Sequence, residues 1–259
     1  MNRTLLRFAG SCTLALVAVW AMPARAQMGE VKEKPPMYSY VGFWNIPRAQ
    51  WADMQKSEEA DQKVLSQGLA SGTIVGYGND VNLVHQPDGA THDGWWSSMS
   101  MAGLINTLNQ FYSNGSATSS VLQSATKHWD SIYVSHFYNW KSGSWKGLYT
   151  HGGQYKLKAD APDDAVAMLA KNFIAPVLEK QLADGTIYEY EIDVEYIHTE
   201  APGTFWIFYI AANADGLDKV SAAVQAAVKA NPLALAAFDS VNDFSGHRDY
   251  LAMTNATYK

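Results

Sequence analysis

One segment of the sequence carries acidic side chains in an alternating pattern that could support proton transfer. Within residues 186–198, carboxyl groups occupy every second position: Glu189, Glu191, Asp193 and Glu195. Alternate residues of a strand point to opposite faces, so a strand here would have one acidic face and one apolar face. Like-charged neighbours raise the pKa of a carboxyl group, which could then act as a general base in a polar pocket wall. The alternative is a solvated face, or a row paired with Lys156 and Lys158.

The same segment has an earlier counterpart. Residues 69–85 resemble residues 182–198, and both copies share the start Leu-Ala-x-Gly-Thr-Ile and a final histidine. Asp80 therefore corresponds to Asp193, and either could be the catalytic base. Two of the later acids are glycines in the first copy, so we expect any single site to be biased toward one half.

Histidines recur as well. His85 corresponds to His198, and both are candidate bases, although their place in the apolar row also suits packed, hydrogen-bonded side chains.

Two further histidines form H-x-D pairs ahead of the last strand of each copy. His128 with Asp130, and His247 with Asp249, would place an imidazole and a carboxyl group on one strand face. Such a pair suits a metal site, a histidine oriented by its acid, or a cap at the start of a strand. A catalytic zinc needs at least three converging ligands. The sequence therefore predicts no metal site and leaves these pairs as the only candidates for one.

Tryptophans on the predicted third strands are candidate ligand contacts. Trp95 and Trp206 would lie near the centre of a sheet, where an indole can stack on a planar ligand. Core packing is the alternative for both.

The elements that must position these residues occur twice, in the order β-α-β-β-α-β. In the first copy, strands are predicted at 38–46, 73–85, 95–101 and 131–138, with helices over 48–69 and from residue 104. In the second, strands are predicted at 155–159, 186–198, 205–211 and 250–258, with helices from residues 163 and 217 and an interruption at Asn231-Pro232. The fold class is therefore α+β. The copies span 37–140 and 148–259, joined by a linker at 141–147.

This layout resembles the dimeric α/β-barrel superfamily of ferredoxin-like domains, as a tandem fusion in which the repeats act as the two subunits. The resemblance implies two four-stranded sheets facing one another, helices outside and a cavity between the sheets. It also implies a monomer that is an internal pseudo-dimer. Members include cofactor-free monooxygenases, isomerase-like enzymes, small-molecule binders and haem enzymes, and the fold alone does not choose among them.

We expect no cofactor, and a haem is the alternative. Residues 89–94 are similar to the G-x-x-D-G signature of dye-decolorising peroxidases, with one residue more and in a predicted hairpin turn. The axial ligand would then be one of four histidines: His128, His136, His198 or His247.

The N-terminus predicts export. Residues 1–26 have the basic start, apolar run and Ala-Arg-Ala end of a bacterial signal peptide cleaved after Ala26, followed by an extended, poorly ordered leader at 27–36. The single cysteine, Cys12, would be removed, which excludes disulfides and thiolate chemistry. Cleavage removes three of the 19 basic residues and none of the 25 acidic ones, leaving a net charge near −9. We expect a periplasmic or secreted protein without membrane insertion or a nucleic-acid partner.

Together these patterns predict an exported small-molecule-binding protein. The first hypothesis is a cofactor-independent monooxygenase or related enzyme acting on an apolar or aromatic molecule. The alternatives are a non-catalytic ligand or haem-binding protein of the cell envelope, and an envelope protein whose inter-sheet space is filled by side chains.

Overall fold

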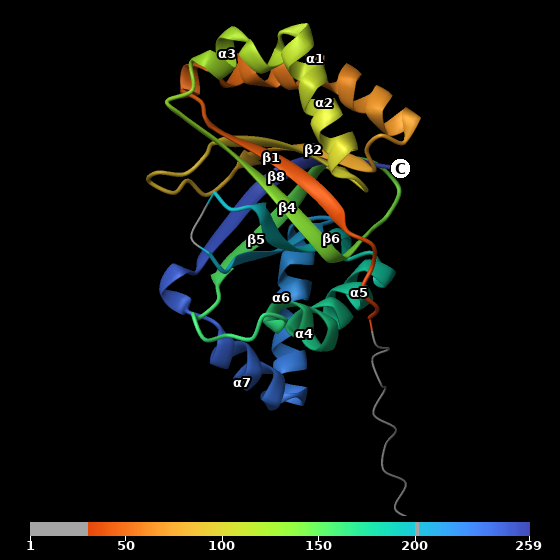
Figure 1. Ribbon diagram of the computed structural model, residues 1–259, viewed down its shortest axis with the longest axis vertical. Helices are drawn as coiled ribbons and strands as arrows, with labels where there is room; N and C mark the ends of the chain where they lie inside the picture. Colours follow the sequence, from red (N-terminus) through yellow and green to blue (C-terminus); the bar gives the residue numbers. More distant parts are fainter. Residues whose placement is uncertain (1–30, 200–201) are drawn as a thin grey trace, which may run out of the picture.

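Eight antiparallel strands form a closed barrel in the computed structural model, which describes residues 31–199 and 202–259 (Figure 1). The first repeat supplies β1 Met37–Asn45, β2 Gly76–Asn82, β3 His92–Ser98 and β4 Lys127–Trp140. The second supplies β5 Gly143–Lys156, β6 Ile187–Ile197, β7 Thr204–Ala211 and β8 Arg248–Tyr258. The predicted signal peptide lies outside the described residues. The α+β fold of two ferredoxin-like repeats in a pseudo-dimeric barrel is confirmed.

The two repeats meet along two hydrogen-bonded seams. Around the barrel the strands follow the order β1-β3-β2-β8-β5-β7-β6-β4, so each repeat forms a four-stranded sheet. The seams are the β2–β8 pair, where Asp80 lies opposite Thr254, and the β4–β6 pair, where Asp193 lies opposite Ser135. The equivalent aspartates therefore lie at equivalent places on the two seams.

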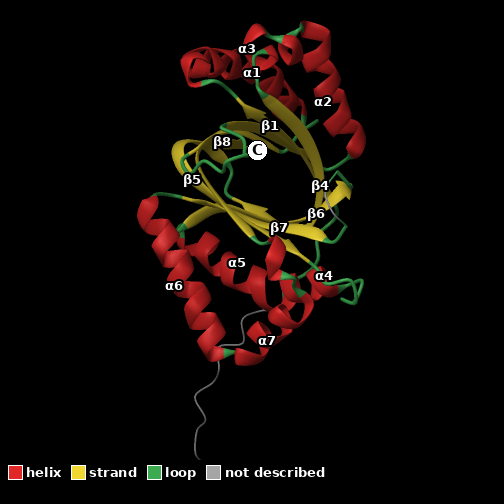
Figure 2. Cartoon of the chain, turned by 90° about the vertical axis from the view of Figure 1, so that its left-hand side faces the viewer, coloured by secondary structure: helices red, strands yellow, loops and turns green. Residues whose placement is uncertain are grey.

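Helices cover the barrel on two opposite sides (Figure 2). The first sheet is covered by α1 Trp51–Ser71, α2 Met101–Asn114 and the short α3 Ser120–Gln123. The second is covered by α4 Ala165–Leu169, a π-helical turn Ala170–Ile174, α5 Ala175–Asp184, α6 Ala214–Ala230 and α7 Pro232–Val241. No helix among the described residues has the length and apolar character needed to cross a membrane.

The repeated sequence motif encodes a helix end and the strand that follows it. Gly72 and Gly185 end α1 and α5 in the left-handed conformation, with φ of 75° and 83°, which glycine adopts without steric cost. The next isoleucines, Ile74 and Ile187, are both fully buried beneath the helices. Each copy thus fixes its helix against its sheet in the same way.

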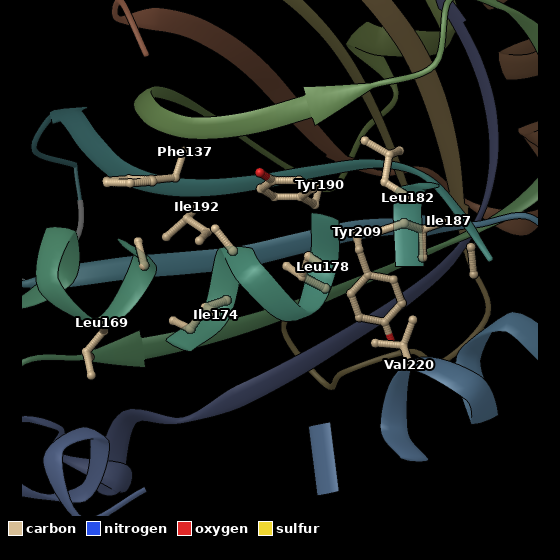
Figure 3. Close-up of a cluster of buried hydrophobic side chains, with 13 residues drawn as sticks. Phe137, Leu169, Ile174, Leu178, Leu182, Ile187, Tyr190, Ile192, Tyr209 and Val220 are labelled. Carbon is tan, nitrogen blue, oxygen red and sulfur yellow. The ribbon is translucent and has the colours of Figure 1, made fainter. Parts of the chain in front are cut away.

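The second repeat has a continuous apolar core between its sheet and its helices. Figure 3 shows this cluster, in which Leu178 and Ile174 face Tyr190 and Ile192 of β6. Burial of such side chains contributes roughly 1.5–3 kcal/mol each. The helices of the second repeat are therefore closely packed against its sheet.

One predicted connection is wrong. Most of the segment 141–147, predicted as a linker, belongs to β5, and the strand predicted at 155–159 is only the end of that element. Glycines in this segment argued against a strand. In the structure Gly147 lies at a bulge with φ of 67°, and the Trp145 indole lies over Gly143. Only residues 141 and 142 join β4 to β5.

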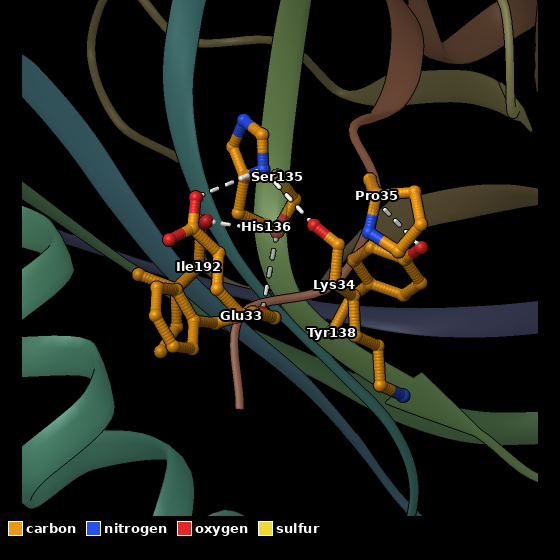
Figure 4. A network of polar contacts seen from close by, with 8 residues as sticks. Glu33, Lys34, Pro35, Ser135, His136, Tyr138 and Ile192 are labelled. Carbon is orange, nitrogen blue, oxygen red and sulfur yellow. Dashed lines mark hydrogen bonds and ion pairs between the residues drawn. The ribbon is translucent and has the colours of Figure 1, made fainter. Parts of the chain in front are cut away.

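The described part of the leader docks on β4. Lys34 donates its backbone N–H to the carbonyl oxygen of His136 at 2.8 Å, and the Tyr138 hydroxyl donates to the carbonyl oxygen of Pro35 at 3.0 Å (Figure 4). His136 lies at a bulge in the β4–β6 pairing, where its backbone is free to accept this bond. Residues 31–36 are thus held in place, contrary to the expected poor order.

Candidate functional site

The predicted acidic row faces the inside of the barrel. Five carboxyl groups, here called the carboxyl cluster, line one internal cavity of about 70 Å³: Asp80, Asp93, Glu189, Glu191 and Asp193. Each residue is at most 7% exposed. The alternative of a solvated face is therefore wrong. Pairing with lysines is wrong as well: Lys158 donates instead to the carbonyl oxygens of Asp239 and Ser240, and neither Lys158 nor Lys156 lines this cavity.

Three members of the cluster form a chain along β6. Glu191 lies within hydrogen-bonding reach of both Glu189 and Asp193. The Tyr258 hydroxyl donates to Glu189, and the Ser39 hydroxyl donates to Glu191 at 3.2 Å. Hydroxyl donors thus replace the basic partners that a buried carboxylate usually needs.

The other two members form a pair on β2 and β3. Asp80 and Asp93 lie within hydrogen-bonding reach of one another, Asp80 accepts from the Thr254 hydroxyl, and Asp93 accepts from the Tyr250 hydroxyl. Asp93 was not among the predicted site residues. Starting the third strand at His92 rather than Trp95 would have placed Asp93 and Trp95 on the inner face by alternation.

Burial favours the protonated form of the carboxyl cluster. It raises the pKa of Asp80 and of Glu191, and burial together with a neighbouring acid raises the pKa of Asp93, Glu189 and Asp193 well above the ordinary range. Two carboxyl groups can hydrogen-bond to one another only through a proton. Each of the three acid–acid contacts therefore needs a proton at neutral pH.

The predicted ligand contacts lie at the cavity wall. Trp95 lines the cavity and bonds to Asp80, and Trp206 lines it with its indole stacked on Phe208 at 5.1 Å. Glu195 is buried but accepts from the Thr199 hydroxyl at 3.1 Å and does not line the cavity. A space of about 70 Å³ is far below the size of typical ligand pockets, so an aromatic substrate must bind elsewhere.

A larger cavity lies between the first sheet and its helices. This cavity, here called the sheet–helix pocket, has a volume of about 220 Å³. Aromatic rings from both layers line it: Tyr40, Trp44, Tyr77, Trp95, Trp96, Phe111 and Tyr112. Such a wall suits an apolar or aromatic ligand. Sequence reasoning missed this pocket.

Two acids of α1 line the same pocket. Glu58 Oε2 accepts from the Asn79 side-chain amide at 2.8 Å, whereas Glu58 Oε1 and Asp61 Oδ1 are buried without a hydrogen-bond partner. Burial, with Asp80 and Asp61 nearby, raises the pKa of Glu58 to about 8. A carboxyl group of this kind can accept or donate a proton near neutral pH.

Glycines let the Trp44 indole lie on the sheet at the pocket wall. A Cβ at Gly42 would lie 2.5 Å from this ring, and a Cβ at Gly94 would lie 3.8 Å from it. His128 stacks on Trp44 with ring centroids 5.0 Å apart, and the Tyr40 hydroxyl bonds to Asp130. The H-x-D pair of β4 therefore belongs to the rim of the sheet–helix pocket.

The second repeat fills the corresponding space. Alignment of the two copies puts Ile174 where the first has Asp61, and Ile174 is a member of the apolar core of Figure 3. Likewise Ile192 replaces Asn79, the partner of Glu58. The asymmetry expected between the halves is therefore real, but it places the larger cavity in the first repeat.

His85 and His198 do not join the aspartates. Both are exposed and lie outside the strands, because β2 ends at Asn82 and β6 at Ile197. His85 instead contacts the Trp51 ring at 5.9 Å. The expectation that these histidines pack in the apolar row or share the barrel site is wrong, since both strands are shorter than predicted.

The H-x-D pairs form as isolated contacts. His128 Nε2 lies 3.4 Å from Asp130 Oδ1, and His247 Nε2 lies 3.6 Å from Asp249 Oδ1, with His151 Nε2 3.8 Å from the same oxygen. The hydrogen bond to Asp130 raises the pKa of His128. Within residues 31–199 and 202–259, no group of three or more His, Cys, Asp or Glu side chains is placed to hold a metal ion.

The candidate axial histidines do not fit a haem. Among them only His128 lines the sheet–helix pocket, and its Nδ1 contacts a backbone carbonyl oxygen at 2.9 Å while Nε2 faces Asp130. His136 and His247 also hold backbone carbonyl oxygens through Nδ1, and His198 is exposed outside the barrel. None of these four histidines is therefore placed to act as an axial haem ligand.

Comparison with known proteins shows the fold. No protein-family model matches the chain, and no curated protein matches it in sequence. A proposed monooxygenase from Lactobacillus acidophilus superposes with a TM-score of 0.62 at 9% identity, covering 87% of this chain and 97% of that chain. An anthrone oxidase-like protein gives 0.50 at 8% identity, covering 87% and 94%. A mutant chlorite dismutase from Candidatus Nitrospira defluvii gives 0.51 at 12% identity, covering 86% and 92%. The chain is thus similar in fold to dimeric α/β-barrel proteins along nearly its whole described length.

Proposed function

We propose that this chain is an exported protein that binds an apolar or aromatic small molecule in the sheet–helix pocket. There it acts as a cofactor-independent monooxygenase or a related enzyme. Export is supported by the signal-peptide pattern of residues 1–26. Binding is supported by the aromatic wall and by a volume of about 220 Å³, which is about three times that of the barrel cavity and just below the range of typical ligand pockets.

The observation that carries the proposal is Glu58 in an aromatic cavity. Its pKa of about 8 leaves a fraction of the carboxyl groups ionised at neutral pH, and each ionised group is a stronger base than an exposed glutamate. Asn79 orients one carboxylate oxygen, so the other oxygen is available for a substrate proton.

This arrangement suits a reaction between an electron-rich carbanion and oxygen. Glu58 would remove a proton from an activated C–H group of the substrate, and the resulting carbanion would pass its electrons to O₂. For anthrone, the balanced reaction is anthrone plus O₂ giving anthraquinone plus water. The substrate is oxidised and one oxygen atom of O₂ is reduced to water, so no further reductant is needed.

The comparisons support the reaction class at the level of fold. Two of the solved structures of similar fold are a proposed monooxygenase and an anthrone oxidase-like protein. The family resemblance makes anthrone a reasonable first probe, and the pocket chemistry supplies the base.

The test uses the mature chain, residues 27–259, with anthrone as the probe. Oxygen consumption and anthraquinone formation are followed with and without a chelator, and ¹⁸O₂ reports the source of the new oxygen atom. We expect turnover that the chelator does not change. Glu58→Gln should lower the rate at least a hundredfold, within the range for loss of a general base. Glu59→Gln alters an exposed acid on the same helix whose charge contributes least to the raised pKa of Glu58, so the rate should change little.

Two outcomes would count against this function. Saturable anthrone binding without oxygen uptake would identify a ligand carrier, the second hypothesis from the sequence. Turnover that survives Glu58→Gln would remove the proposed base.

A further inference from the structure

We infer that the interior of the barrel is a second binding site, which takes a small primary ammonium ion in exchange for a proton of the carboxyl cluster. The ligand class is ammonium itself or the head group of a short alkylamine. This site lies on the other side of Trp95, which lines both cavities, and it does not rest on the function proposed for the sheet–helix pocket.

The first argument is the imbalance of charge inside the cavity. Five carboxyl groups line it, and its wall carries no lysine, arginine or histidine. The neutral donors reaching the cluster are hydroxyl and indole groups, so three acid–acid contacts remain that only a proton or a cation can bridge. An ammonium ion brings both the charge and the missing donors.

The second argument is an oxygen atom that lacks a partner. Asp193 is 2% exposed and lines the cavity, yet its Oδ1 accepts no hydrogen bond. A buried acceptor left unpaired costs about 1–3 kcal/mol, and an ion or water is one of the partners that satisfy such atoms in native structures. Asp193 therefore supplies the acceptor around which a donor would bind.

Size selects the cation. A cavity needs roughly 10–15 Å³ to hold one water molecule, so about 70 Å³ accommodates several groups of that size. Methylammonium has two heavy atoms and fits this limit. A metal ion would need three or more carboxylate or imidazole ligands around one point, which the described residues do not provide. An N–H donor instead reaches each oxygen at ordinary hydrogen-bond distance.

A wider space adjoins the internal cavity. Phe43, Trp206 and Tyr250 line both the internal cavity and a space of about 500 Å³ at one end of the barrel. Trp129 stacks on Phe43 at 5.1 Å beside this opening. The rim is also charged: it carries Lys127 and Arg248 beside Asp88, Asp130 and Asp249, and Lys127 Nζ lies 5.0 Å from the centroid of the Trp129 ring.

Binding is a simple exchange of charges. A protonated carboxyl group of the cluster loses its proton to solvent, and the resulting carboxylate accepts N–H bonds from the ammonium group. No covalent bond between heavy atoms forms or breaks, and nothing is oxidised. The titratable groups facing this site are Asp80 of β2, Asp93 of β3, the three β6 acids, and Tyr250 and Tyr258 of β8.

The test is calorimetric titration of the mature chain, residues 27–259, with methylammonium chloride. Measurements in two buffers of different ionisation enthalpy give the number of protons released per cation. We expect about one proton released, and hence a Kd that falls about tenfold per pH unit as long as the cluster holds that proton. Tetramethylammonium, which has no N–H group, should not bind.

A variant pair locates the site. Asp193→Asn should weaken methylammonium binding at least tenfold, while Glu59→Gln should leave it unchanged. Equal binding of tetramethylammonium, absence of proton release, or full affinity in a folded Asp193→Asn protein would each overturn the inference. If Asp193→Asn does not fold, the pH dependence of the wild-type Kd and the tetramethylammonium comparison decide the question. Anthrone turnover is read separately, because the two cavities have different lining acids.

Discussion

Replacement of Glu58 by glutamine should stabilise this protein at neutral pH. The pKa of Glu58 is raised from an ordinary value of 4.5 to about 8 by burial and by the nearby acids Asp80 and Asp61. The folded state therefore holds a proton that the unfolded state has already lost. The stability linked to this proton is fully present below about pH 4.5 and is lost as pH rises toward about 8. Glutamine keeps the shape and the amide contact but carries no charge, so it avoids this loss.

The size of the gain follows from the interval between the two pKa values. Each pH unit spent between them costs about 1.4 kcal/mol. At pH 7 the wild-type protein has crossed most of that interval, so Glu58→Gln should raise the free energy of unfolding by about 3 kcal/mol. Near pH 4 both forms of residue 58 are neutral in the folded and unfolded chains, and the gain should vanish.

Urea unfolding at pH 4, 7 and 8.5, followed by circular dichroism, measures this difference directly. Glu59→Gln is the matched control, because Glu59 is exposed on the same helix and should change stability by less than about 0.5 kcal/mol. A gain of equal size at pH 4 and pH 7 would show that packing, not ionisation, is responsible. No gain at pH 7 would refute the assignment of Glu58 as a group held neutral by burial. If Glu58→Gln both raises the free energy of unfolding and abolishes turnover, Glu58 lowers the stability of the protein while serving its activity.

Three further predictions test the geometry by denaturant unfolding. Gly94→Ala should add about 0.5–1 kcal/mol of stability, because its new methyl group would lie 3.8 Å from Trp44, and it should reduce anthrone binding. Gly78→Ala should instead destabilise the protein by about 1–3 kcal/mol, because its Cβ would lie 2.6 Å from an indole ring. A Gly78→Ala protein more stable than the Gly94→Ala protein would contradict the packing described. Tyr258→Phe removes the hydroxyl donor of a buried acid and should cost about 1–3 kcal/mol, whereas an unchanged midpoint would show that Glu189 does not depend on it. Deletion of residues 27–36 removes three hydrogen bonds to β4 and should cost about 1–3 kcal/mol; equal stability of the two chains would mean that the docked leader contributes nothing.

The sequence was most informative where the chain repeats itself. Residues 69–85 and 182–198 predict the two copies of the fold, since they encode the helix end, the turn and the strand that follows. Alternation along β6 then places its acids on one face, and the barrel turns that face inward. Periodicity fixes such features locally, so they could be predicted without knowledge of the packing.

The histidines and the sheet–helix pocket depended on information that periodicity lacks. His85 and His198 seemed to extend the strands, but both strands end earlier, and strand ends are set by pairing with neighbours. The pocket arises where α1 presents Glu58 and Asp61, whose counterparts in the second repeat are Lys171 and the buried Ile174. One signal was present: Glu58 and Asp61 lie at helical spacing between Met54 and Leu65, on the stripe that faces the sheet.

The two-residue connection between β4 and β5 also makes this barrel a natural candidate for fragment complementation. A chain cut at residues 141 and 142 would yield halves that meet along the β2–β8 and β4–β6 seams and through side-chain hydrogen bonds across the interior, such as Ser39 to Glu191 and Tyr250 to Asp93. The sheet–helix pocket lies wholly within the first fragment, whereas the carboxyl cluster draws acids from both. One fragment could therefore keep its aromatic ligand while ammonium affinity returned only on reassembly. The duplicated architecture would then supply a two-fragment sensor in which ammonium binding reports the association of the fragments.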